Sequence, residues 1–181
     1  EFAPPTDHTL ATPQGSYLTL SSSNYYSRSI VGLHSPDMNG TKCVEFWYYM
    51  YGSDVGTLTM YRRVGASPTK VWTETSSAQP VWRLAQTTLS PTTPTGKYFA
   101  RIQFQYTEPT YKGLVALDDL IVHYGQCVSA GGNASNYCSF DGDGEDGLCG
   151  FTNSPLADFD WQLGNASVST ATTGPTLDVY F

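Results

Sequence analysis

The stretch "CVEFWYYMYGSDVGTLTMYRRV", residues 43–64, decides the fold class of this chain. Its first half is dense in aromatic residues, its middle reads GSDVG, and its second half alternates apolar with polar residues. Aromatic and β-branched residues favour strands, alternation is the period of a half-buried strand, and Gly with Asp favours a turn. The stretch therefore predicts two strands joined by a short turn.

Segments of the same character recur on both sides of this stretch. They cover residues 16–22, 71–76, 81–89, 98–106 and 113–125. Pieces rich in Gly and Pro separate them, and no window keeps a helical period for more than two turns. The sequence therefore predicts an all-β fold, an antiparallel jelly-roll β-sandwich. The small, polar stretch "VSAGGNASNY", residues 128–137, is expected to be a flexible linker.

Composition narrows the range of partners. The chain has 181 residues, enough for one generous β domain, with a net charge of −7 and only nine Lys and Arg residues. A nucleic-acid partner is not expected, because neutralising phosphates needs clustered basic residues. No apolar run approaches the roughly 20 residues that a bilayer span needs, so we expect no membrane insertion by this segment.

Cysteines and glycosylation motifs point to an extracellular setting. The chain has four cysteines without a close CxxC pair, which suggests two disulfides rather than a metal site: Cys43, Cys127, Cys138 and Cys149. It also has three Asn-x-Ser/Thr motifs, at Asn39, Asn133 and Asn165. Together they predict a glycoprotein that is secreted, in the matrix or in a cell-surface ectodomain.

The stretch "CSFDGDGEDGLCGF", residues 138–151, places four acidic residues between two cysteines. These are Asp141, Asp143, Glu145 and Asp146. Such oxygen-rich side chains suit a hard cation such as Ca²⁺. An EF-hand is excluded, because Asp146 stands where glycine is needed, Thr152 stands where the bidentate Glu belongs, and no flanking helices are predicted. A solvated acidic loop without an ion remains the alternative.

Two blocks of the chain resemble the MAM domain family of meprins, neuropilins and receptor-type tyrosine phosphatases. The C-terminal block, residues 138–178, resembles the family's opening: Cys and Phe, an acidic residue, Cys-Gly-Phe, Asp-Phe-Asp-Trp, then Gly-Pro with Asp. The N-terminal block resembles the remainder, through "PPTDHTLATPQGSYLTL", "CVEFWYYMYGSDVGTLTMY" and "YKGLVALDDLIVHYGQC". The order departs from the family, because here the opening follows the closing cysteine.

The resemblance implies that the chain is an out-of-phase segment of a tandem MAM array. Residues 1–127 would be a MAM domain that lacks its first strands, and residues 138–181 would be the opening strands of a MAM domain. A short echo between "APPTDH" (3–8) and "GPTLDV" (174–179) fits a repeat, although chance could also produce it. We expect residues 138–181 to complete the same sandwich in permuted strand order, or else a neighbour's sandwich by strand exchange.

The resemblance also implies the disulfide pairs and a cation site. The pairs would be Cys43 with Cys127 and Cys138 with Cys149. A structural cation, Ca²⁺ or else Na⁺, would be held by the opening strand and the closing "ALDDL", with the candidate ligands Asp118, Asp141 and Asp143. Strand alternation lets only one of Asp118 and Asp119 face inward, and we expect it to be Asp118.

The function implied is an extracellular adhesion or protein-interaction module, with homophilic or matrix association and a protein partner. The alternative is a calcium-stabilised carbohydrate-binding module, in which the aromatic stretch 45–51 could stack on sugar rings. Packing is the favoured role of that stretch, and Phe159 and Trp161 are also expected in the core. No enzyme is expected, because His8, His34 and His123 lie in no recognisable catalytic motif.

Overall fold

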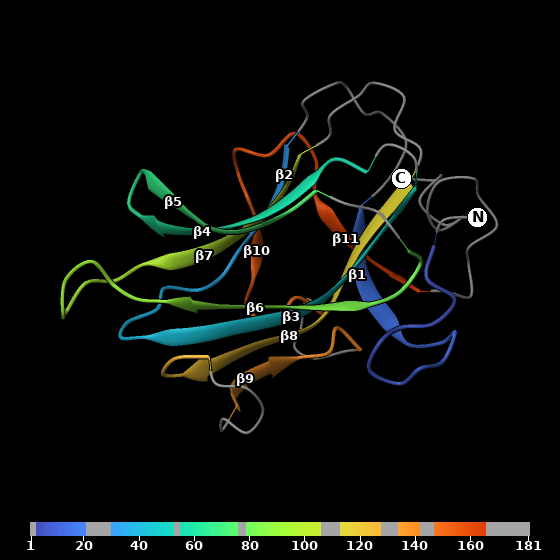
Figure 1. Ribbon diagram of the computed structural model, residues 1–181, viewed down its shortest axis with the longest axis horizontal. Helices are drawn as coiled ribbons and strands as arrows, with labels where there is room; N and C mark the ends of the chain where they lie inside the picture. Colours follow the sequence, from blue (N-terminus) through green and yellow to red (C-terminus); the bar gives the residue numbers. More distant parts are fainter. Residues whose placement is uncertain are drawn as a thin grey trace.

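The computed structural model describes residues 3–20, 30–52, 55–75, 79–105, 113–127, 134–141 and 147–165. These residues form eleven strands in two antiparallel sheets that pack face to face (Figure 1). None of the described residues forms a helix that could cross a membrane. The predicted all-β sandwich is confirmed.

The first sheet is built around β8. Its strand order is β11 (Trp161–Asn165), β1 (Ser16–Leu20), β8 (Gly113–Tyr124), β3 (Lys42–Gly52) and β6 (Arg83–Leu89), and β9 (Ala134–Cys138) also pairs with β8. Because β3 occupies one edge of β8, β1 and β9 share the other edge. β1 lies opposite residues 116–117 and β9 lies opposite residues 120–123. Asp118 and Asp119 therefore lie at the junction of two partner strands.

The second sheet has the order β10 (Thr152–Asn153), β2 (Ile30–His34), β7 (Phe99–Gln105), β4 (Thr57–Val64) and β5 (Ser67–Glu74). Strands β1, β3, β4, β6, β7 and β8 occur where the sequence predicts them, and β5 begins earlier than predicted. The short strands β2 and β10 were not predicted.

Alternating side chains of the central strands fill the space between the sheets. In β3, Phe46, Tyr48 and Met50 join the main core, whereas Tyr49 belongs to a smaller cluster with Tyr17, Leu114 and Ala116. This second cluster lies on the outer face of the first sheet, where the N-terminal residue Ala3 packs against it. The stretch 45–51 therefore packs on both faces, as the favoured prediction requires.

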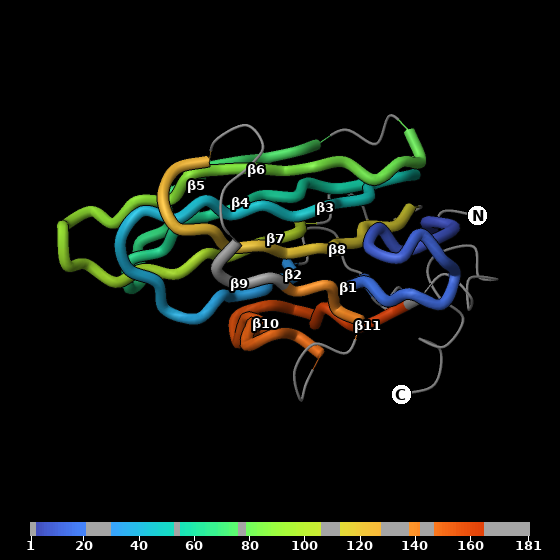
Figure 2. The backbone as a smooth tube through the Cα atoms, turned by 90° about the horizontal axis from the view of Figure 1, so that it is seen from below, coloured from blue at the N-terminus to red at the C-terminus, as the bar shows by residue number. Residues whose placement is uncertain are grey.

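The C-terminal segment lies within the same sandwich as the body of the chain. β11 pairs with β1 over five residue pairs, and β10 pairs with β2. Trp161, Phe140 and Phe151 are buried in the main core, and Phe159 packs against it. Figure 2 shows β10 and β11 along one margin of the sandwich and β6 along the opposite margin. Residues 166–181 of the predicted segment lie outside the described residues.

The prediction of a flexible linker over residues 128–137 is wrong for residues 134–137. Ala134–Cys138 forms β9, which runs antiparallel to β8 from Ala134 opposite His123 to Cys138 opposite Leu120. Small polar residues have low β propensity, but the edge of β8 beyond β1 offers unpaired backbone groups that a returning strand can satisfy. Backbone pairing therefore overrides the composition at this place.

Candidate functional site

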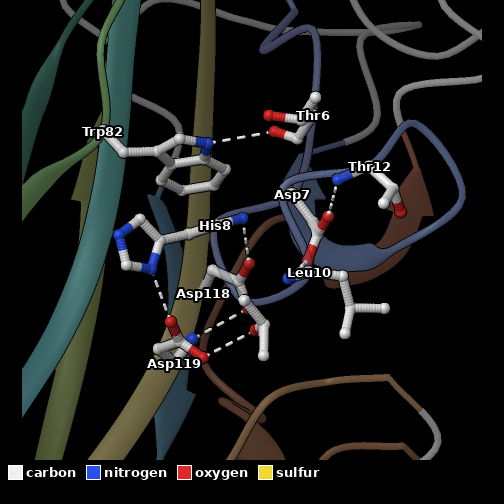
Figure 3. A network of polar contacts seen from close by, with 9 residues as sticks. Thr6, Asp7, His8, Leu10, Thr12, Trp82, Asp118 and Asp119 are labelled. Carbon is white, nitrogen blue, oxygen red and sulfur yellow. Dashed lines mark hydrogen bonds and ion pairs between the residues drawn. The ribbon is translucent and has the colours of Figure 1, made fainter.

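The candidate site lies on the outer face of the first sheet, where the N-terminal segment covers the junction of β1 and β9 on β8. Figure 3 shows this segment folded against β8 and against Trp82. We call its polar centre the junction cluster, and its members are Asp7, His8, Thr9, Asp118 and Asp119.

A β-bulge turns both aspartates of β8 to the same side. The pairing with β3 passes from Glu45 opposite Ile121 to Trp47 opposite Asp118, so β8 carries one extra residue here. Asp119 has a φ of 49°, which breaks the strand alternation. The expectation that only one of the two aspartates faces inward is therefore wrong. Both carboxylates are buried, at 0% and 7% exposure, and both contact the N-terminal segment rather than the main core.

The N-terminal segment supplies most of the hydrogen bonds to these carboxylates, and the backbone of β8 supplies one. The backbone N–H of His8 donates to Oδ2 of Asp118 at 2.8 Å, and the N–H of Asp119 donates to Oδ1 of Asp118 at 2.8 Å. Nδ1 of His8 lies 2.5 Å from Oδ2 of Asp119, and the Thr9 hydroxyl donates to Oδ1 of Asp119 at 2.6 Å. The cluster thus fastens residues 8 and 9 to the bulge.

Burial is the main cause of an unusual titration in this cluster. Burial, together with the negative charges of Asp119 and Asp7, raises the pKa of Asp118 to about 7, against the two N–H bonds that lower it. A carboxyl group with this pKa is partly protonated at neutral pH, since an ordinary Asp titrates near pH 4.

Asp7 shapes the loop that follows it. Its carboxylate accepts hydrogen bonds from the N–H groups of Leu10 at 2.6 Å and Thr12 at 3.0 Å, and it is 1% exposed. A Cβ atom on Gly15 would lie 2.1 Å from Cγ of Asp7, so only glycine fits where the loop returns to β1. Residues 7–15 are therefore built around one buried carboxylate.

Aromatic rings complete the attachment of the segment. The His8 ring stacks on Trp47 with 3.7 Å between centroids, and Nε1 of Trp82 donates to the Thr6 carbonyl at 3.0 Å. Tyr17 and Tyr49 meet the Trp82 ring edge to face. The sequence contained no indication of a role for Trp82, because it lies 76 positions from Thr6 and no local pattern links the two residues.

The predicted cation site of Asp118, Asp141 and Asp143 stays a prediction. Asp118 lies beside Asp7 and Asp119, as above, whereas Oδ1 of Asp141 accepts the Ser16 N–H at 2.5 Å at the start of β1. Asp143 lies outside the described residues. Among the residues described, no group of three His, Cys, Asp or Glu side chains has a geometry suited to a metal.

Two disulfides link the strands that carry the site. Cys43 of β3 is bonded to Cys127, which follows β8, and Cys138 at the end of β9 is bonded to Cys149. These are the pairs that the resemblance implied.

The glycosylation motifs occupy different positions. Asn39 is exposed, and Asn165 is the last residue of β11, while Asn133 lies outside the described residues. Glycosylation at these three positions stays a prediction.

Comparisons with known proteins identify the family. The family described as MAM domain, meprin/A5/mu matches residues 1–128. The human MAM domain-containing glycosylphosphatidylinositol anchor protein 1 is 32% identical over 133 residues, which cover 68% of this chain. The mouse MAM domain-containing protein 2 is 28% identical over 181 residues, which cover 95% of this chain. A solved structure titled "PbXyn10C CBM APO" aligns at 11% identity with a TM-score of 0.42, over 83% of this chain and 88% of that one.

The chain spans 13% of the length of the human relative and 25% of the length of the mouse relative. The family match covers well over half of this chain, including β1 to β8 and both ends of the Cys43–Cys127 disulfide. The chain belongs to the MAM domain family.

Proposed function

We propose that this chain is an extracellular protein-interaction module that mediates homophilic or matrix association, as one unit of a tandem MAM array. Membership of the MAM family supports an interaction module. Two disulfides suit an oxidising compartment. The name of the human relative describes it as a glycosylphosphatidylinositol anchor protein, which fits a cell-surface location. The alignment with the mouse relative extends beyond residue 128, which supports a continuing array.

The observation that carries self-association is the open edge of β6. This strand pairs with β3 on one side, and no described strand pairs with it on the other (Figure 2). Leu84, which lies opposite Trp47, is 48% exposed, and the preceding Val81 is 47% exposed. The strand contains one charged residue, Arg83, and no proline.

Natural proteins usually protect such edges with charges, prolines or bulges, because an open edge pairs readily with another chain. A second copy could therefore add its own β6 antiparallel to this one, in a two-fold symmetric contact. The exposed Leu84 and Val81 would then be partly covered by the partner, which adds apolar burial to the backbone hydrogen bonds.

Sedimentation of the protein over a range of concentrations tests this contact. We expect reversible dimerisation of the wild type, weakened at least about tenfold by Leu84→Lys, because a charge would be buried at the contact. The matched control is Leu156→Lys, at a leucine that is 76% exposed outside the strands. A wild type that stays monomeric at all concentrations, or equal effects of both variants, would rule out association through β6.

We also propose a structural Ca²⁺, with Na⁺ as the alternative, held by Asp118, Asp141 and Asp143. The donor chemistry fits, since all three offer carboxylate oxygens and hard cations take oxygen ligands. Support comes from the buried negative charge at the junction cluster, where a cation would lower the pKa of Asp118 from its raised value of about 7. The proposal assigns two ligands to the described residues Asp118 and Asp141 and the third to Asp143.

The alternative function, a calcium-stabilised carbohydrate-binding module, needs a surface other than the stretch 45–51. The outward ring of Trp47 in that stretch is covered by His8, which stacks on it. Tyr49 is 2% exposed and packs against Trp82. We assign no catalytic residue, because His8 fastens the N-terminal segment and His123 lies 3.4 Å from Glu45 within the sheet.

A further inference from the structure

We propose that the outer face of the second sheet binds an anionic glycan, with Arg101 as the group that anchors a sulfate or carboxylate. The binding surface is a row of side chains across all five strands, which we call the basic row. Its members are Thr152, His34, Arg101, Tyr61 and Lys70. Phe99 and Arg63 lie one step further along β7 and β4.

The strand register places these side chains on one face. Thr152 lies opposite His34, His34 opposite Arg101, Arg101 opposite Tyr61, and Tyr61 opposite Lys70. Directly opposed residues of antiparallel strands point to the same side of a sheet. That side is the outer one, since the neighbours Leu33, Ile102 and Met60 belong to the main core. With strands about 4.8 Å apart, the row is about 19 Å long.

Arg101 is a buried cation without a partner in the described part of the chain. Its side chain is 8% exposed, its Nε is buried without a hydrogen bond, and no described acid forms an ion pair with it. Burial lowers its pKa, and the positive charge of Arg63 lowers it further. A buried guanidinium without an acceptor is costly, so an anion that supplies paired oxygens would offset that cost.

Arg63 and His34 place further unpaired nitrogens beside Arg101. Arg63 donates to the Ala66 carbonyl at 3.2 Å, but its Nε is buried without a partner, and its guanidinium lies 5.8 Å from the Phe99 ring centroid. The His34 ring lies 5.0 Å from the same ring, and its Nε2 is also buried without a partner. Burial, then the charges of Arg101 and Arg63, lower the pKa of His34 to about 4, so it is neutral at neutral pH.

The charge of this sheet is opposite to that of the chain. The chain as a whole carries −7, yet the described strands of the second sheet contain one acid, Glu74. Glu74 lies opposite the core residue Leu58 and accepts a hydrogen bond from Tyr48, so its carboxylate lies on the inner side of the sheet, away from the basic row. The same strands contain four of the nine Lys and Arg residues of the chain. Three of them, Arg63, Lys70 and Arg101, lie on the outer face, whereas Arg62 lies opposite the core residue Ala100 and donates to the Ser90 carbonyl. A local positive field of this kind attracts polyanions.

The geometry favours a glycan over a peptide or a nucleic acid. A sheet face offers side chains and no free backbone groups, so it cannot add a peptide as an extra strand. Tyr61 and Phe99 put aromatic rings between the cations, and such rings can stack on sugars while the guanidinium groups bind sulfate or carboxylate. Two disulfides and an overall negative charge also suit a compartment where the polyanions are acidic glycans rather than nucleic acids.

Binding of the full chain to heparin tests the proposal, with hyaluronan, neutral dextran and poly-L-glutamate as comparison probes and EDTA present in all arms. We expect heparin to bind with an affinity that falls as salt rises, and dextran not to bind. If poly-L-glutamate binds as tightly as heparin or more tightly, the proposed glycan ligand is wrong and the basic row binds an acidic protein surface instead. No binding of heparin or hyaluronan at low salt would overturn the proposal.

Two Arg→Gln variants, one in each sheet, test where heparin binds. Arg101→Gln should weaken heparin binding about tenfold or more, whereas Arg83→Gln, on β6 of the other sheet, should change it less than about twofold. The melting temperature of Arg101→Gln should be unchanged or raised, because the variant removes an unpaired buried charge. Equal binding by both variants would overturn the assignment. Leu84→Lys should keep full heparin binding, which separates this site from self-association through β6.

Discussion

His8 and Asp119 join the N-terminal segment to the bulge of β8 through a contact of 2.5 Å between Nδ1 and Oδ2. The His8 ring also stacks on Trp47, so one side chain touches a charged group and an aromatic ring of two neighbouring strands. Stability of the first sheet's outer face should therefore depend strongly on this residue.

His8→Ala should lower the free energy of unfolding by about 2–3 kcal/mol, because it leaves the Asp119 carboxylate buried with fewer hydrogen bonds and removes the stack on Trp47. Urea denaturation measures the change. Leu10→Ala, at a residue of the same segment that is 55% exposed, serves as the control and should cost well under 1 kcal/mol. Equal costs for the two variants would mean that the contact does not hold the segment.

The raised pKa of Asp118 predicts that the stability of the folded protein falls as the pH rises. Its folded-state pKa of about 7 exceeds the ordinary value of 3.8, so the folded state binds more protons than the unfolded state between these two values. Stability therefore decreases as the pH rises from about 4 through 7 and levels off above. Urea denaturation of wild type and Asp118→Asn in EDTA at several pH values isolates this carboxyl group. The difference between the two proteins should grow in favour of the variant as the pH rises, and a difference that is constant with pH would contradict the raised pKa.

Calcium should raise the melting temperature if the proposed cation site exists. A protein that binds an ion only when folded gains stability with ion concentration, and Asp141→Asn should abolish the gain by removing a ligand. Asp37→Asn, at an exposed aspartate, removes the same charge and should keep the gain. A parallel titration with Na⁺ identifies the ion. A melting temperature that does not respond to either cation argues for a solvated acidic loop.

Gly15→Ala tests the packing of the loop around Asp7. Its new Cβ would lie 2.1 Å from Cγ of Asp7, so the carboxylate would have to leave the N–H groups of Leu10 and Thr12. We expect a loss of about 3 kcal/mol or more in urea denaturation. Gly40→Ala is the comparison, because its φ of 61° strains a side chain but no atom lies within 4 Å of the new Cβ. It should cost only about 1 kcal/mol, and a smaller loss for Gly15→Ala than for Gly40→Ala would contradict the packing.

Sequence periodicity predicted the central strands because their side chains alternate between a packed core and the outer face. Phe46, Tyr48 and Met50 of β3 illustrate this, since alternation alone places them on one side. The bulge at Asp119 had no such signal, because an extra residue in a strand depends on the pairing partner rather than on local composition. β9 was missed for the same reason, as its polar residues form a strand only because β8 offers an edge.

The candidate site was only partly predictable. The acidic pair of β8 was identified from the resemblance, but its partners His8 and Thr9 are distant in sequence and became visible only in the fold. The basic row was not predicted, since Arg63 and Arg101 belong to different strands and meet only through their register. Spatial clusters built across strands leave no local pattern.

The central claim is that the C-terminal segment completes both sheets of its own chain. Amide hydrogen exchange of the monomer, isolated by size exclusion, tests it most directly. We predict that the paired amides of Trp161–Asn165 and Ser16–Leu20 are protected to a similar degree, because the two strands form one ladder and open together. Rapid exchange throughout residues 161–165 in the monomer, with protection appearing only in a dimer, would contradict the claim and assign the segment to a neighbouring molecule.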